Sequence, residues 1–171
     1  SRTHYGFLKR LLEIEIPEIN DGTVILYSVA REAGSRSKIA VYTEEENIEP
    51  IGCVIGNGGN RINRVLKQIG NEKIDVVLYD KNPVQFIKNA LSPAKEIEVF
   101  IKDYKKKEAI AIASSDNLSL AIGKKGQNVK LASRLTHYKI EVKGLDEVNI
   151  EEYREKYSNT KPEDGIEEEN V

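Results

Sequence analysis

One pattern occurs twice in this chain, sixty-seven residues apart, and limits what the chain can fold into. The first copy is Ile51-Gly-Cys-Val-Ile-Gly-Asn-Gly-Gly59 and the second is Leu118-Ser-Leu-Ala-Ile-Gly-Lys-Lys-Gly126. In each copy, apolar residues at helical spacing stop at a glycine, two residues intervene, and a second glycine starts a new helical pattern. A single Gly-x-x-Gly carries little information because glycine is common. Two copies in the same context at one offset indicate a duplicated module.

The segments around both copies follow the same order: helix, strand, strand, short helix, glycine loop, helix, strand. Alternating residues rich in Val, Ile and Tyr predict the strands, and apolar spacing of three and four predicts the helices. The predicted strands are residues 23–30, 38–43, 73–79, 95–102, 108–113 and 139–143. We therefore expect an α+β fold in which each module is a three-stranded sheet with helices on one face.

The repeat predicts a first domain over residues 1–81, a second over 82–144, and an acidic tail, partly disordered, over 145–171. Domains of this length are small but within the usual range. Only Lys81-Asn-Pro83 separates the two modules. Because so short a linker leaves little freedom, we expect the modules to keep a nearly fixed relation and both loops to face one strand of nucleic acid.

The net charge of −2 conceals a strong asymmetry along the chain. The first 143 residues hold 23 basic and 18 acidic side chains, whereas the remainder holds 3 and 10. A basic body with an acidic extension is typical of a protein that binds a polyanion. No stretch has the ~20 apolar residues of a membrane helix, so we expect no membrane contact.

Several residue types are too sparse for other functions. The single Cys53 cannot form an internal disulfide, which fits a cytoplasmic protein. His4 and His137 have no partner at metal-ligand spacing, so no metal ion or other cofactor is expected. The second loop lacks the Gly-Lys-Ser/Thr of a phosphate-binding P-loop, and no nucleophile–base pair is visible. We therefore expect a protein that is not an enzyme.

The glycine loops have the chemistry of a phosphate clamp. Backbone N–H groups at the open start of the following helix, together with the helix dipole, attract anions, and glycine allows close approach. The predicted RNA-contacting residues are Ile55, Gly56, Asn57, Gly58, Gly59, Arg61 and Arg64 at the first loop, Ile122, Gly123, Lys124, Lys125, Gly126, Gln127, Asn128, Lys130 and Arg134 at the second, and Arg36 and Lys38 beside a strand turn.

These features resemble the KH domain, whose Gly-x-x-Gly loop clamps about four nucleotides of a single strand. The leading helix resembles the bacterial, type II arrangement. Longer segments, Ala30-Arg-Glu-Ala-Gly-Ser-Arg-Ser-Lys-Ile-Ala-Val-Tyr42, Asn89-Ala-Leu-Ser-Pro-Ala-Lys95 and Leu118 to Asn128, are similar to the tandem KH region of the NusA family of bacterial transcription factors. The resemblance runs from Ser1 to about Lys143.

The resemblance implies binding to nascent RNA, contact of the full-length protein with RNA polymerase and other elongation or antitermination factors, and modulation of pausing, termination and antitermination. In that family two further domains precede the KH pair, so we expect this chain to be part of a longer protein, and to be monomeric. There is one departure: NusA-like first loops usually carry a lysine before the second glycine, where this chain has Gly58. The alternative hypothesis is a KH fold that docks proteins and has little RNA contact of its own.

Overall fold

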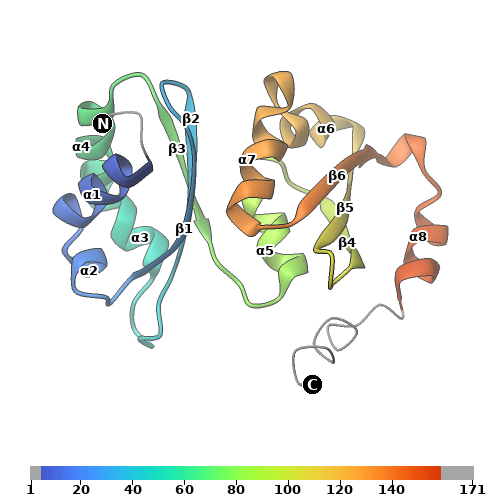
Figure 1. The fold of residues 1–171 in the computed structure, drawn as a ribbon, viewed down its shortest axis with the longest axis horizontal. Helices are drawn as coiled ribbons and strands as arrows, with labels where there is room; N and C mark the ends of the chain where they lie inside the picture. The colour runs from blue at the N-terminus through green and yellow to red at the C-terminus, as the bar shows by residue number, and fades with distance from the viewer. Residues whose placement is uncertain (1–4, 159–171) are drawn as a thin grey trace. The chain divides into compact units, whose positions relative to one another are not determined.

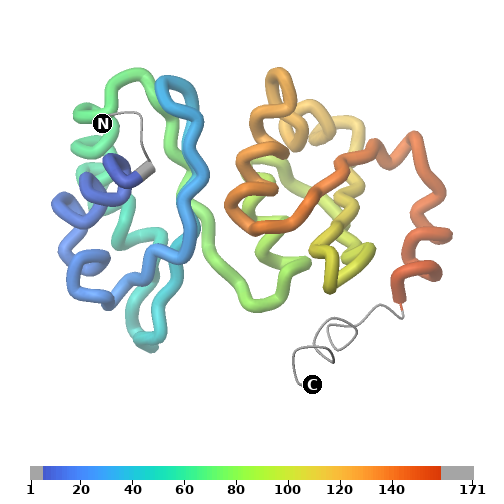
Figure 2. The backbone as a smooth tube through the Cα atoms, viewed as in Figure 1, coloured from blue at the N-terminus to red at the C-terminus, as the bar shows by residue number. Residues whose placement is uncertain are grey.

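The computed structural model describes residues 5–158. The chain divides into two compact units, Ser1–Asp80 and Lys81–Val171, and each is described here by itself (Figures 1 and 2). Both units contain a three-stranded sheet, so the predicted α+β fold with two three-stranded modules is confirmed. Within residues 5–158, no helix has the length and apolar character needed to cross a membrane, and no cluster of His, Cys, Asp and Glu could hold a metal ion.

The first unit is one sheet with its helices packed on a single face (Figure 1). Strand β2 lies in the centre, antiparallel to β1 and parallel to β3. In chain order the elements are α1 (Tyr5–Glu15), α2 (Pro17–Asn20), β1 (Ile25–Glu32), β2 (Arg36–Tyr42), α3 (Pro50–Ile55), the 3-10 turn η1 (Asn57–Gly59), α4 (Asn60–Ile69) and β3 (Lys73–Leu78).

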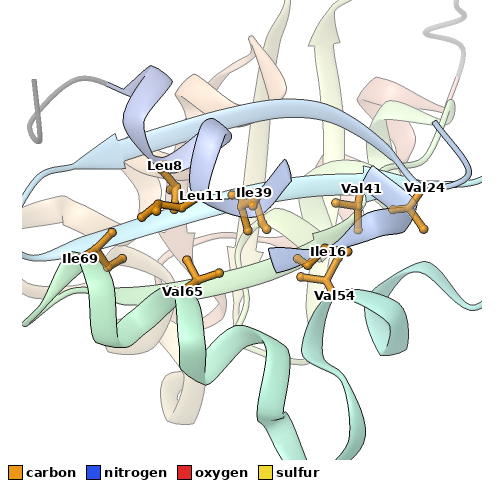
Figure 3. Close-up of a cluster of buried hydrophobic side chains, with 10 residues drawn as sticks. Leu8, Leu11, Ile16, Val24, Ile39, Val41, Val54, Val65 and Ile69 are labelled. Carbon is orange, nitrogen blue, oxygen red and sulfur yellow. The ribbon is translucent and has the colours of Figure 1, made fainter. Parts of the chain in front are cut away.

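The core of the first unit explains why these segments form these elements. Leu8 and Leu11 of α1, Ile39 and Val41 of β2, and Val65 of α4 point toward one another between the helices and the sheet (Figure 3). Their spacings, three along the helix and two along the strand, place each pair on one face. Burying this apolar surface fixes α3 and α4 against the sheet, and with them the loop between the two helices.

The second unit repeats the topology, with β5 central, antiparallel to β4 and parallel to β6. Helices α5, α6 and α7 cover one face of the sheet (Figure 1). The elements are α5 (Pro83–Ala90), β4 (Ile97–Asp103), β5 (Glu108–Ala113), α6 (Ser115–Ile122), the 3-10 turn η2 (Lys124–Gly126), α7 (Gln127–Thr136), β6 (Lys139–Gly144), the 3-10 turn η3 (Leu145–Glu147) and α8 (Ile150–Tyr157).

Helix α8 corrects the prediction that helices cover only one face of each sheet, and it forms within the predicted acidic segment, where the sequence pattern allowed a frayed helix over residues 151–157. It lies on the other face of the second sheet (Figure 1), where the rings of Tyr153 and Tyr157 each have their centroid 6.0 Å from that of Phe100. Arg154 bridges Glu98 at 3.1 Å. The rest of the predicted tail, residues 159–171, lies outside the described residues.

Candidate nucleic-acid interface

The first glycine loop is a compact turn between α3 and α4. Gly56 ends α3 at φ 79°, and Gly58 and Gly59 have φ values of 60° and 78°. Residues other than glycine rarely adopt such positive φ values. A Cβ atom at Gly56 would collide with the side chains of Asn60 and Arg61, so the loop packs directly onto the start of α4.

The second loop has the same backbone conformation. Gly123 has φ 79° and ψ 168°, against 79° and 173° for Gly56. Lys125 has φ 56° and ψ 25°, against 60° and 23° for Gly58. A lysine therefore occupies, in the second loop, the left-handed position that glycine occupies in the first. Gly58 in place of the usual lysine therefore changes the side chain at this position but leaves the backbone conformation of the loop unchanged.

Both loops leave the start of the following helix open. Gly59 and Gly126 are the N-cap residues of α4 and α7, and neither helix has a side-chain hydrogen bond at its cap. The first N–H of each helix, at Asn60 and Gln127, donates to the carbonyl oxygen of Asn57 and Lys124, respectively. The N–H groups that follow have no side-chain capping acceptor, and they carry the positive end of the helix dipole. This is the backbone geometry that binds phosphate.

The second loop adds exposed positive charge to this geometry. Lys124 and Lys125 are exposed, and within residues 5–158 neither forms an ion pair. Lys130 donates from Nζ to the Lys125 carbonyl oxygen at 3.3 Å, and Arg134 is exposed one turn further along α7. Half-buried Ile122 provides apolar surface beside them. The structure thus brings the predicted basic residues of the second loop together on one exposed surface.

The first loop has no such surplus of charge. Arg61 donates to Glu18 Oε1 at 2.8 Å and to the Cys53 carbonyl oxygen at 3.0 Å. Arg64 pairs with Glu15 at 3.1 Å, although its side chain stays 55% exposed. The charges of both arginines predicted to contact RNA at the first loop are therefore offset by carboxylates from α1 and α2.

Arg36 and Lys38 follow the turn between β1 and β2, as predicted, and both belong to β2. Arg36 Nε and Lys38 Nζ each donate to Asp75 Oδ2 at 2.8 Å. Lys38 has a fully buried side chain, and this desolvation lowers its pKa even though Asp75 opposes the shift. Burial raises the pKa of the Asp75 carboxyl, but the hydrogen bond from Arg36 and the charge of Lys38 outweigh it and leave the pKa below its ordinary value. Both cations join β2 to β3, and the buried side chain of Lys38 offers no surface to a ligand, whereas that of Arg36 is 21% exposed.

Asn128 is also internal. Its residue is 2% exposed, and its Nδ2 donates to the carbonyl oxygens of Leu91 and Ala121, both at 3.0 Å. A Cβ atom at Gly123 would lie 2.7 Å from the Asn128 backbone nitrogen. Asn128 therefore fixes the second loop against α5 and α6, and it offers no side-chain surface for RNA. The neighbouring Gln127 remains half-buried at the start of α7.

A hollow of about 410 Å³ beside the first loop was not foreseen from the sequence. It is lined by Gly56, Asn57, Asn60 and Arg61 of the loop and α4, together with residues of the segment before α3 and with Glu18 of α2. The sequence carried no signal of this site, because the residues that line the hollow come from α2, α3 and α4 and are far apart along the chain.

Comparison with known proteins agrees with this geometry. Residues 2–79 match the family model of the NusA-like first KH domain, and residues 83–150 match that of the NusA-like second KH domain. The protein is 50% identical over 143 residues to the transcription termination/antitermination protein NusA of Bacillus subtilis, covering 84% of this chain and 38% of that protein. It is 45% identical over 152 residues to the NusA protein of Thermus thermophilus, covering 86% and 39%.

A solved structure, the crystal structure of APE1850, aligns with a TM-score of 0.55 and 27% identity, covering 78% of this chain and 96% of that one. The chain spans about two fifths of the length of the bacterial relatives named above. The two matched KH models, in tandem and in the family's order, account for both glycine loops and both sheets. The chain belongs to the NusA family, and the part of that family it contains is the tandem pair of KH domains.

Proposed function

We propose that this chain binds single-stranded RNA and that the second glycine loop is its main phosphate clamp. One observation carries the proposal: Lys124 and Lys125 stand exposed and without ion pairs, within the described residues, at the uncapped start of α7. Phosphate binding there gains both from the lysine charges and from the backbone N–H groups. Further predicted contacts belong to the same proposal: Ile55, Gly56, Asn57, Gly58, Gly59, Arg61, Arg64, Ile122, Gly123, Gly126, Gln127, Lys130 and Arg134.

The relatives are named as transcription termination/antitermination proteins, and we place this chain in the same process. The RNA is then the nascent transcript, and RNA polymerase and other elongation or antitermination factors are contacted by the full-length protein. This role requires no catalysis, no cofactor and no membrane, and it places the protein in the cytoplasm as a monomer. The two loops act on one strand if the short linker holds the units in register.

Reversing both lysine charges tests the clamp. In Lys124→Asp/Lys125→Asp, RNA affinity should fall steeply, because two phosphate contacts become repulsive, while thermal stability stays unchanged at these exposed positions. Lys106→Asp/Lys107→Asp in the turn between β4 and β5 makes the same change in net charge away from the loop and should bind RNA nearly as well as the parent.

The parent should also show a log–log salt slope near about −3, as expected for roughly four neutralised phosphates on a single strand. A slope near zero would remove the electrostatic basis of the proposal. Unchanged RNA affinity in the Lys124→Asp/Lys125→Asp protein would instead support the alternative, a KH fold that docks proteins.

A further inference from the structure

The buried side chain of Asn128 connects the ends of three helices in the second unit. Asn128 is the second residue of α7, so its backbone N–H belongs to the start of the helix that follows the glycine loop. Its Nδ2 donates to the carbonyl oxygens of Ala121 and Leu91, both at 3.0 Å. Ala121 lies in the last turn of α6, and Leu91 is the C-cap residue of α5. Carbonyl groups at helix ends lack a partner within their own helix, and this one amide serves two of them.

The second glycine loop packs directly on Asn128. A Cβ atom at Gly123 would lie 2.7 Å from the Asn128 backbone nitrogen and 2.8 Å from its Cβ atom, so only glycine fits this contact. Lys124 and Lys125 follow Gly123 immediately in the chain. A shift of Asn128 would therefore move the backbone that carries both lysines.

The first unit has the same arrangement at Arg61, sixty-seven residues earlier. Arg61 Nη1 donates to the carbonyl oxygen of Cys53, in the last turn of α3, and to Glu18 of α2. A Cβ atom at Gly56 would lie 3.0 Å from the Arg61 backbone nitrogen. In both units, this position therefore donates to the helix before the loop and to the helix before the first strand. Arginine and asparagine share side-chain N–H donors but not charge, so the common loop shape goes with the donors.

We propose that Asn128 is the positioning residue of the phosphate clamp: its two hydrogen bonds hold the second loop in the shape that presents Lys124 and Lys125 to phosphate. This inference rests on the proposed RNA binding. Asn128 acts through the loop and does not touch RNA, since its residue is 2% exposed. A loop that is already in its binding shape loses less conformational freedom when RNA binds, and this raises the affinity.

Asn128→Leu tests the proposal, because leucine has a similar size and no N–H donor. At 0.1 M salt, its affinity for a short single-stranded RNA should fall about tenfold. The log–log salt slope should become less negative by about 0.7 to 1.4, the change expected when one or two phosphate contacts on a single strand are lost. The measurements are made at a temperature at which thermal denaturation shows the protein to be folded.

Thr136→Val is the matched control at the other end of α7. Thr136 is also buried, at 5% exposure, and its Oγ1 donates to the Ala132 carbonyl oxygen at 2.9 Å. Valine keeps the shape and removes this hydrogen bond, so the variant should lose stability. Its RNA affinity and salt slope should equal those of the parent, because the loop is not disturbed.

A double-mutant cycle separates positioning from a purely structural role. In Lys124→Ala/Lys125→Ala, the side chains that Asn128 positions are gone, so adding Asn128→Leu should weaken RNA binding further by less than about twofold. If Asn128→Leu does not fold, Asn128→Ser, which keeps one hydroxyl donor, decides in the same assays and should show a smaller change in the same direction.

Two results would overturn the positioning role and leave the clamp standing. One is a folded Asn128 variant with the affinity and salt slope of the parent. The other is an equal loss of affinity with and without the two lysines, because Asn128 would then act on another part of the protein. A parent protein that binds no RNA would overturn the proposed function itself.

Discussion

Gly58→Lys should convert the first loop into a second phosphate clamp. Gly58 has almost the same backbone angles as Lys125, and a Cβ atom built on it meets no atom within 4 Å. The second loop therefore shows that a lysine fits this backbone, and the first loop has space for it. The left-handed conformation costs a non-glycine residue about 1–2 kcal/mol, partly offset by the lower entropy of the unfolded chain, so the loss of stability should not exceed about 2 kcal/mol.

The gain in binding follows from counterion release. One additional phosphate contact on a single strand makes the log–log salt slope more negative by about 0.7. The affinity that this contact contributes therefore rises about fivefold when the salt concentration falls from about 1 M to about 0.1 M. The gain should vanish at high salt. The opposite change, Lys125→Gly, should lose a similar factor and make the slope less negative by the same amount.

Fluorescence anisotropy with a short single-stranded RNA across a salt series measures both quantities, and thermal denaturation measures stability. Gly22→Lys is the control, because Gly22 also has a positive φ of 86° and no atom within 4 Å of a built Cβ, but lies in the turn before β1. If Gly58→Lys leaves the slope unchanged, or if Gly22→Lys changes it equally, the loop does not contact phosphate at this position and the reasoning fails.

Three further results are expected. Glu72→Gln should destabilise the first unit by about 3–5 kcal/mol in urea unfolding, because Arg31, whose side chain is 4% exposed, would lose its carboxylate partner; a loss below 1 kcal/mol would contradict this. Burial raises the pKa of Glu72, but hydrogen bonds from Arg31 and others outweigh it and lower the pKa. Ionised Glu72 therefore contributes to the free energy of unfolding above the ordinary carboxyl pKa, and this contribution is lost as the pH falls through the lowered pKa. In Glu72→Gln, the free energy of unfolding should depend less on pH in that window. Gly123→Ala should weaken RNA binding and stability more than Gly126→Ala: both have positive φ, but only at Gly123 would the new Cβ press on the backbone of Asn128, and equal effects would show that this contact is unimportant.

Local signals were enough to predict the modules. Pro50 begins α3, Gly56 ends it and Gly70 ends α4, each at the position where proline or glycine chemistry predicts a boundary. The duplicated order of elements then predicted two three-stranded sheets. The family resemblance rests on the same local segments, and the matched family models confirm it.

The partners of charged residues could not be predicted in the same way. Lys38 and Asp75 are opposite each other because β2 and β3 pair in parallel, and 37 residues of chain separate them. Arg61 meets Glu18 across 43 residues, through a short helix, α2, that the sequence pattern did not predict. A lysine that packs inside a sheet and a lysine that binds RNA look alike in sequence, since only tertiary contacts distinguish them.

Helix α8 has a practical consequence for anyone who divides this protein into fragments. Ile110 and Ile112 are 4% and 3% exposed on β5, and Tyr153 and Tyr157 border the same hollow as Ile110, whereas Ile150 borders one with Ile112. The match to the second KH domain stops at residue 150, where α8 begins. A fragment cut at that boundary would expose an apolar stripe to water and would tend to self-associate. The family match therefore ends one helix before the folded second domain does. A fragment meant to contain a stable, monomeric second domain should extend through Tyr157.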